Sequence, residues 1–189
     1  MARDTVRAVP VEVIPYSPHW TVQFDRVAET LRAGLSEVTS ATVEHVGSTS
    51  VPGLAAKPIL DIDVVVDAED MAAAIAAIEG TGYAHRGDLG VTDREAFEAP
   101  DDGLRRNVYV CRRGSLNVRN HLAVRDVLRG RADLRDEYGA VKMALAAEPD
   151  MDIETYVARK STVLQKVLAV SELTAGERLQ ILRLNDPSA

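Results

Sequence analysis

Residues 43–66 read VEHVGSTSVPGLAAKPILDIDVVV, and this stretch decides the fold. Its aliphatic and β-branched residues predict one strand over residues 41–46 and a second over 59–66. The second strand carries Asp61 and Asp63, and side chains two residues apart in a strand point to the same side of the sheet. Two carboxylates at that spacing repel each other unless a cation lies between them. A hard divalent ion with oxygen ligands, Mg²⁺ or Mn²⁺, is therefore the expected partner of these aspartates.

The turn after the first strand begins with the small residues Gly47 and Ser48. Gly47 permits a close approach of the backbone, and Ser48 offers a hydroxyl and an N–H group to phosphate oxygens. Ser50 adds a further hydroxyl in the same loop, and Lys57 adds a point charge that suits a phosphate. Either motif by itself is more often a solvated strand end or an ordinary turn. Their combination predicts a metal–nucleotide site.

The order of a strand, Gly-Ser, a spacer and Asp-Ile-Asp on a second strand resembles the signature of the polymerase-β-like nucleotidyltransferase superfamily. The longer string GSTSVPGLAAKP followed by DID resembles one branch of it, the GrpB (UPF0157) family. The aromatic residues Trp20 and Phe24, and the pattern RDxLR over residues 125–129, extend the resemblance to roughly residues 11–170. The resemblance implies an α+β fold, a mixed sheet flanked by helices with a C-terminal helical cap. It implies a class of chemistry more than a substrate.

The chain departs from this family at one predicted strand. Where the family has a strand of the form H-x-H, this chain has Asn107 and Tyr109. If those histidines bind metal or substrate, this member works differently or has lost activity. Many nucleotidyltransferases also have a third carboxylate on a neighbouring strand. Glu95 and Glu98 are the candidates here, but strand alternation places them on opposite faces.

Two lysines in the C-terminal part each follow a tyrosine by four residues: Lys142 follows Tyr138, and Lys160 follows Tyr156. This spacing places each pair on one face of a predicted helix. Either each lysine packs its stem against the ring, or both lysines reach the phosphates of the nucleotide. The family resemblance favours the second interpretation.

The charge distribution adds a predicted anion site. Residues 105–135 hold nine arginines against two aspartates, a charge of +7 that leaves −14 for the rest of a chain whose net charge is −7. We expect more than half of these arginines on solvated helix faces and in i,i+4 pairs, although two or three facing Asp61 and Asp63 would suffice to hold a triphosphate. The acidic total charge and the 4% content of aromatic residues argue against nucleic acid as a partner.

Length and composition favour one domain over residues 1–189, with a sheet core over about 11–114 and a helical part over about 115–189. Further strands of this core are predicted over residues 11–14, 91–98 and 104–112. The only cysteine, Cys111, lies in an apolar strand and suits a buried position. Because neither a membrane-spanning run nor a signal segment is recognisable, we expect no membrane partner and a cytoplasmic protein. The four histidines lack metal-ligand spacing, and His45 beside the turn is either structural or a ligand contact.

The sequence thus predicts a Mg²⁺-dependent nucleotidyltransferase that moves a nucleoside monophosphate from an NTP, with ATP favoured, to a small-molecule or protein acceptor. Two alternatives stay open. One is a catalytically silent nucleotide-binding accessory or regulatory protein. The other is an ATP-dependent enzyme that activates a carboxylate for amide formation.

Overall fold

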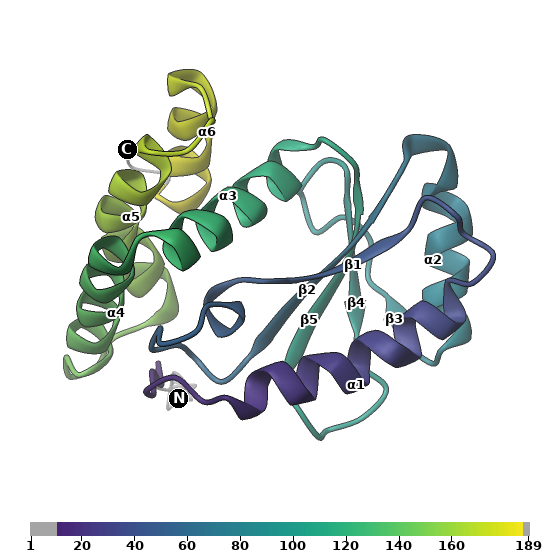
Figure 1. Cartoon of the computed structure of the whole chain (residues 1–189), viewed down its shortest axis with the longest axis horizontal. Coiled ribbons are helices and arrows are strands. Elements are labelled where there is room, and N and C mark those ends of the chain that lie inside the picture. Colours follow the sequence, from purple (N-terminus) through teal and green to yellow (C-terminus); the bar gives the residue numbers. More distant parts are fainter. Residues whose placement is uncertain (1–10, 187–189) are drawn as a thin grey trace, which may run out of the picture.

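A single mixed sheet of five strands organises the structure, a computed structural model that describes residues 11–186 (Figure 1). The strands are β1 (Thr42–Val46), β2 (Leu60–Val66), β3 (Ala84–His85), β4 (Arg94–Glu98) and β5 (Arg106–Arg112). Their order in the sheet is β1-β2-β5-β4-β3. β2 and β5 are parallel, and the other neighbours are antiparallel. The predicted α+β fold with a mixed sheet is confirmed.

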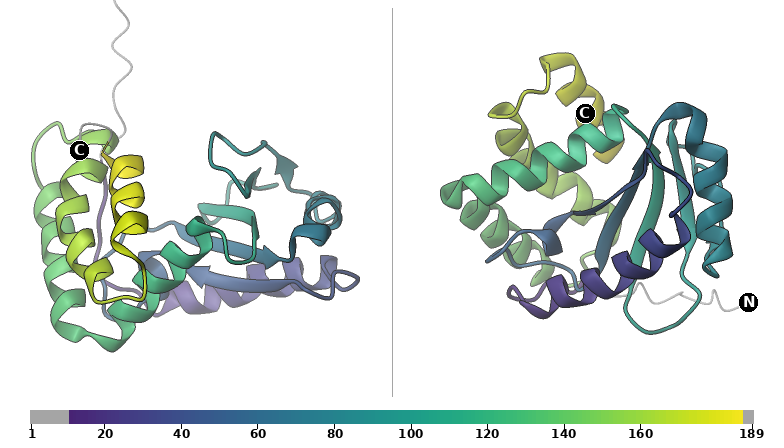
Figure 2. Two further views of the ribbon diagram at one scale, coloured as in Figure 1. Left: turned by 90° about the horizontal axis from the view of Figure 1, so that it is seen from above. Right: turned by 45° about the vertical axis from the view of Figure 1, so that its right-hand side comes forward.

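Six α-helices accompany the sheet: α1 (His19–Gly34), α2 (Met71–Gly80), α3 (Leu116–Gly130), α4 (Ala132–Ala146), α5 (Ile153–Ala169) and α6 (Ala175–Asn185). Two 3₁₀ turns, η1 (Ser48–Ser50) and η2 (Ala68–Asp70), follow β1 and β2. Figure 2 shows α4, α5 and α6 gathered to one side of the sheet, with α3 running between the sheet and this helical group. None of the helices within residues 11–186 is both long and apolar enough to cross a bilayer.

Strict alternation along β2 gives the sheet one apolar face and one chemically distinct face. Leu60, Ile62, Val64 and Val66 are fully buried in the main hydrophobic core. Residues of α1 and α2 join them in this core, so both helices cover the same face. The intervening residues of β2, beginning with Asp61, point to the opposite face, where α3 packs. The burial of one face therefore presents the acidic residues on the other.

A second hydrophobic core holds the helical group together and fixes the loop after β1. Side chains of α3, α4, α5 and α6 meet there, including the fully buried Leu128 of α3. Val51 and Leu54, which directly follow η1, insert into the same core. Burial of these two loop residues holds the Gly-Ser turn between the sheet and the helices.

Most predicted elements are present, with differences near the sheet edges. The segment predicted as a strand over 11–14 forms only an isolated bridge between Ile14 and Ala56. The strand predicted over 91–98 begins at Arg94, because Leu89 and Asp93 have positive φ angles that interrupt extended structure. The short β3 was not predicted, since two residues carry no periodic pattern.

Candidate functional site

Asp61 and Asp63 leave β2 on one face of the sheet, as the sequence predicts. Oδ1 of Asp61 accepts a hydrogen bond of 2.7 Å from Nδ2 of Asn107, the residue that lies opposite it on β5. Burial raises the pKa of Asp61, and the Asn107 hydrogen bond only partly opposes this shift. The carboxylate form of Asp61 is therefore poorly stabilised by the protein itself and gains from a cationic partner.

Gly47 places the turn directly against this carboxylate. Its φ of 68° lies in the left-handed region, and a Cβ added there would overlap Oδ2 of Asp61 and approach its Cγ to 2.9 Å. Only glycine permits both the conformation and the contact. The Gly-Ser turn and the first aspartate thus form one packed unit, although the loop between them is long.

Asp63 has no exposed surface, and its two oxygens differ in environment. Oδ2 lies 2.8 Å from Nδ1 of His121 on α3, whereas Oδ1 is buried and has no hydrogen-bond partner within the described part of the chain. Burial alone lowers the pKa of His121, but the charge and hydrogen bond of Asp63 outweigh it and the net shift is upward. A buried carboxylate oxygen without a partner is costly, so this atom is available for a further ligand.

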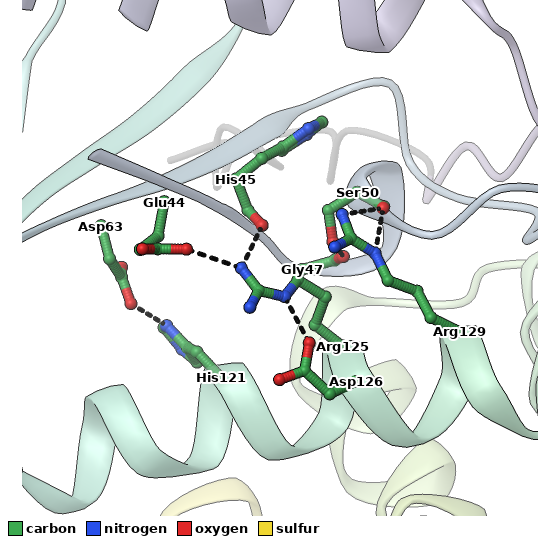
Figure 3. Close-up of polar contacts among 9 residues, drawn as sticks. All are labelled: Glu44, His45, Gly47, Ser50, Asp63, His121, Arg125, Asp126 and Arg129. Atoms are coloured by element: carbon green, nitrogen blue, oxygen red, sulfur yellow. Dashed lines mark hydrogen bonds and ion pairs between the residues drawn. The ribbon is translucent and has the colours of Figure 1, made fainter. Parts of the chain in front are cut away.

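One face of α3 holds the turn in place (Figure 3). His121, Arg125 and Arg129 are spaced by four residues and point toward β1, β2 and η1. Arg125 donates to Oε2 of Glu44 at 2.8 Å and to the carbonyl of His45 at 3.3 Å. Arg129 donates twice to the carbonyl of Ser50, at 3.1 and 2.8 Å. The two arginines of the RDxLR pattern therefore position the turn.

Three lysines form the side of the site that faces the carboxylates, and we call them the lysine wall: Lys57, Lys142 and Lys160. The ammonium group of Lys142 donates to Oγ of Ser48 at 2.8 Å. Only 2% of Lys142 is exposed, and its pKa falls to about 6 through burial and then through the charges of Lys160 and Lys57. Burial also lowers the pKa values of Lys57 and Lys160. The charged forms of the three lysines are therefore poorly stabilised and gain from a bound anion.

Two buried tyrosines support the lysine wall. The ammonium group of Lys142 lies 4.7 Å from the ring centroid of Tyr138. The corresponding distances from Lys160 and Lys57 to the ring of Tyr156 are 5.7 and 5.9 Å. The predicted tyrosine–lysine pairs therefore exist, and they also point into the site.

One pocket of about 290 Å³ collects most of the predicted residues. Its lining includes Gly47, Ser48, Lys57, Asp61, Lys142 and Lys160. Asp63 lies beneath this lining, behind His121. Ser50 is not part of the lining, because its side chain is buried and its hydroxyl donates to the carbonyl of Gly47 at 2.6 Å. The phosphate contact predicted for Ser50 is therefore replaced by a role in shaping the turn.

The donor set of the site suits one hard cation. Residues 11–186 contain no cluster of three histidine, cysteine, aspartate or glutamate side chains arranged around a metal position. Asp61 at the pocket surface and the unpartnered Oδ1 of Asp63 nevertheless fit a Mg²⁺ ion, which is commonly held by one or two carboxylates while substrate phosphates and water complete its coordination. Neither candidate for a third carboxylate takes part, because Glu95 pairs with His85 and Glu98 pairs with Arg86 at the far edge of the sheet.

Most arginines of the basic segment are paired, as expected, and the anion site that this segment suggests does not lie at the pocket. None of the nine arginines in residues 105–135 lines the pocket. Seven of them form ion pairs with nearby acids instead. The arginine that does line it is Arg94 of β4, which lies outside that segment. His45, for which two roles stayed open, is structural: its ring stacks on Phe24 at 4.5 Å and hydrogen-bonds to Thr49 at 3.1 Å.

Sequence reasoning missed His121, Arg94 and Asn120. His121 was set aside because it has no metal-ligand spacing to another histidine. Its spacing of four residues from Arg125 on a predicted helix was the available signal. No local pattern distinguishes Arg94 or Asn120 from surface residues, and only the sheet register and the packing of α3 bring them to the pocket.

Comparisons with known proteins show the family of the chain. The sequence model of the GrpB protein family matches residues 10–170. A UPF0157 protein of Halalkalibacterium halodurans is 35% identical over 166 residues, which make up 87% of this chain and 84% of that protein. The crystal structure of the conserved protein GrpB from Enterococcus faecalis superposes with a TM-score of 0.69 at 33% identity and covers 84% of this chain and 98% of that one.

A more distant likeness identifies the fold. A structure of Cid1, described for its RNA terminal uridylyl transferase activity, superposes with a TM-score of 0.51 at 15% identity. The match covers 69% of this chain and 41% of Cid1, so the shared part is the core fold. With a family match over most of its length and a relative at 35% identity, the chain belongs to the GrpB family.

Proposed function

We propose that this protein is a Mg²⁺-dependent nucleotidyltransferase that transfers a nucleoside monophosphate from an NTP, with ATP favoured, to a small-molecule or protein acceptor. The observation that carries the proposal is the presence of two charge sets in one pocket. Asp61 lines the pocket with Asp63 buried beneath it, and the lysine wall lines the same pocket. A metal-bound triphosphate is a ligand that matches both sets at once.

The residues of the chain have distinct roles in this proposal. Lys142 and Ser48, already hydrogen-bonded to each other, bind the terminal phosphates, and Lys57 and Lys160 add positive charge. Asp61 and Asp63 hold the metal. When bound, Mg²⁺ or Mn²⁺ supplies charge neutralisation at the α-phosphorus. Asn107 and His121 orient the two carboxylates through their hydrogen bonds.

The transfer itself is a displacement at the α-phosphorus. The acceptor oxygen forms a bond to that phosphorus and releases its proton to water. The bond from the α-phosphorus to the bridging oxygen breaks, and pyrophosphate leaves with the electron pair. Positioning and charge stabilisation supply most of the rate enhancement in such reactions, so the rigid seating of Gly47 against Asp61 is central.

The catalytically silent alternative also has an observation in its favour. Asn107 and Tyr109 stand opposite Asp61 and Asp63 on β5, so the neighbouring strand adds no third carboxylate. A two-carboxylate site suits nucleotide binding whether or not turnover follows. The alternative of carboxylate activation for amide formation differs in its products, because AMP or ADP appears only when the acid and an amine are supplied.

The test is a calorimetric titration of ATP, CTP, GTP and UTP with and without Mg²⁺. The wild type is compared with the double variant Asp61→Asn/Asp63→Asn. Asp67→Asn is the matched control, because Asp67 directly follows the same strand, but its side chain is half-exposed and pairs with Arg113. Metal-dependent binding that is lost in the double variant and kept in the control supports the proposal. Absence of binding to all four nucleotides rejects it.

Product analysis then separates the candidates. Pyrophosphate release with a labelled acceptor indicates nucleotidyl transfer. Binding without release of pyrophosphate, AMP or ADP indicates the silent alternative.

A further inference from the structure

Arg94 is a pocket-lining cation that the proposed nucleotide site does not use. Its residue on β4 pairs with Cys111 of β5, so its side chain points to the same face as Asp63 and Tyr109. The guanidinium lies 4.4 Å from the ring centroid of Tyr109 and lines the pocket. The structure gives it no hydrogen bond or ion pair within residues 11–186, and its Nε is buried without a partner.

Acidic residues do lie near Arg94, so a shortage of acids does not explain why its guanidinium is unpaired. Both neighbours of Arg94 in the chain are acidic, but Asp93 pairs with Arg112 and Glu95 pairs with His85. Strand alternation turns Glu95 to the other face of the sheet. The chain thus neutralises the acids around Arg94 with other partners and keeps this guanidinium free at the pocket.

Arg94 lies at the end of the pocket away from the lysine wall. The register places Arg94 beside Cys111 of β5 and level with Val65, four residues beyond Asp61 along β2, whereas Lys142 bonds to the turn that packs on Asp61. Asn120, the residue before His121 on α3, lines this same pocket and has a buried Oδ1 without a partner. Two unpartnered polar atoms, one donor and one acceptor, therefore belong to side chains of the pocket lining.

We infer that Arg94 binds an oxyanion, a carboxylate or a phosphate monoester, carried by the acceptor substrate. This inference rests on the proposed function. If the lysine wall binds the departing phosphates, an in-line displacement requires the acceptor to approach the α-phosphorus from the opposite side. That side is the Arg94 end. Stacking on Tyr109 occupies one face of the guanidinium and leaves the N–H groups in its plane for a fork-like contact with two oxygens.

The probes for this inference share one carbon skeleton: glycerate, glycerol 3-phosphate and glycerol. Each is titrated calorimetrically into protein saturated with Mg²⁺ and the α,β-methylene analogue of the preferred nucleotide, which fills the lysine wall and prevents turnover. The variants are Arg94→Ala and Arg94→Lys, and Arg94→Lys keeps the charge and the stem against Tyr109. Arg86→Ala is the matched control, because Arg86 is an exposed arginine paired with Glu98.

The expected result is that at least one anionic probe binds the wild type and that glycerol does not. Arg94→Ala weakens this binding at least tenfold, Arg94→Lys weakens it less, and Arg86→Ala changes it less than twofold. Preference between glycerate and glycerol 3-phosphate identifies the oxyanion as a carboxylate or a phosphate. Absence of binding by both anions, or equal binding by wild type and Arg94→Ala, overturns the inference.

If the proposed function is wrong, the nucleotide analogue itself does not bind. This result can be told apart from failure of the oxyanion inference. The probes are in that case titrated into the unloaded protein. Binding that depends on Arg94 still supports an oxyanion site, and binding that does not depend on it overturns the inference.

Discussion

Nδ1 of His121 lies 2.8 Å from Oδ2 of Asp63, and 58 residues of sequence separate the two side chains. Asp63 has no exposed surface, so His121 is the group that satisfies this oxygen. The contact joins the first turns of α3 to β2, an interior strand of the sheet. It also places the side chain of His121 over Asp63, the second carboxylate of the site.

Replacing His121 by alanine should destabilise the protein by about 3 kcal/mol in metal-free buffer, because it leaves a buried charge without its partner. The double variant Asp63→Asn/His121→Ala should be more stable than His121→Ala alone, since the stranded charge is gone. Urea unfolding measures both free energies. His19→Ala, at an exposed histidine, is the control; a His121→Ala variant as stable as this control would contradict the prediction.

Replacing Gly47 by alanine should weaken nucleotide binding more than its backbone strain explains. Gly114→Ala is a matched control, because Gly114 has a similar φ of 76° but no atom within 4 Å of an added Cβ. The control should lose about 1 kcal/mol of stability from the left-handed conformation alone. Gly47→Ala should lose more and should displace Asp61. Equal effects of the two variants on stability and on nucleotide affinity would argue against the proposed contact.

Lys142 should make the protein less stable than it would be with a neutral side chain. Its pKa of about 6 in the folded state is below the ordinary value near 10.5, so folding at neutral pH requires loss of a proton. Stability should therefore fall as the pH drops from about 10 toward 6. Lys142→Met should raise Tm, remove this pH dependence and abolish nucleotide binding. Thermal unfolding between pH 6 and 9 measures the first two effects.

The lowered pKa of Lys142 predicts that the protein takes up a proton when nucleotide binds. A polyanion beside Lys142 raises its pKa from about 6, so at pH 7.5 the complex holds more protons than the free protein. Calorimetric titrations in buffers with different ionisation enthalpies measure this number directly. Lys142→Met should show no uptake from this site, and uptake that persists in the variant would assign the proton elsewhere.

His45 should make the protein acid-sensitive. Burial, followed by the charges of Arg129 and Arg125, lowers its pKa to about 4, below the ordinary value of 6.5. Between pH 6.5 and 4 the imidazole of His45 binds a proton in the unfolded chain but not in the folded protein. The free energy of unfolding therefore declines by roughly 3 kcal/mol as the pH falls through that interval. His45→Gln keeps a polar group near Thr49 and should flatten the decline. A His45→Gln variant with an unchanged pH profile would locate the sensitivity at another group.

The local part of the site was predictable because it depends on short-range geometry. Alternation in β2 places Asp61 and Asp63 on one face, and helical spacing places Lys142 beside Tyr138. Both rules relate residues within one element. The turn is a mixed case, because the need for glycine at Gly47 follows from its φ of 68° and from its contact with Asp61 on another strand.

The remainder depends on contacts between elements. Arg94 reaches the pocket only because β4 pairs with β5 in a particular register, and His121 only because α3 crosses the polar face of the sheet. The arginines of residues 105–135 show that contacts between elements can also remove a site that the sequence predicts. Their number predicts an anion site, yet acids that are adjacent in space, such as Asp101 beside Arg106, neutralise most of them.

The lysine wall is expected to make the stability of the protein, and not only its chemistry, depend on its ligand. Two of its three amino groups come from α4 and α5, whereas the carboxylates come from the sheet, so the polyanion of the proposed function would join the two parts of the molecule. Without it, the cost of burying the charged forms of these lysines favours local opening of the helices, and an opened segment is what proteases recognise. The abundance of the protein in a cell is therefore expected to follow the supply of its ligand, so that turnover removes copies that have nothing to bind.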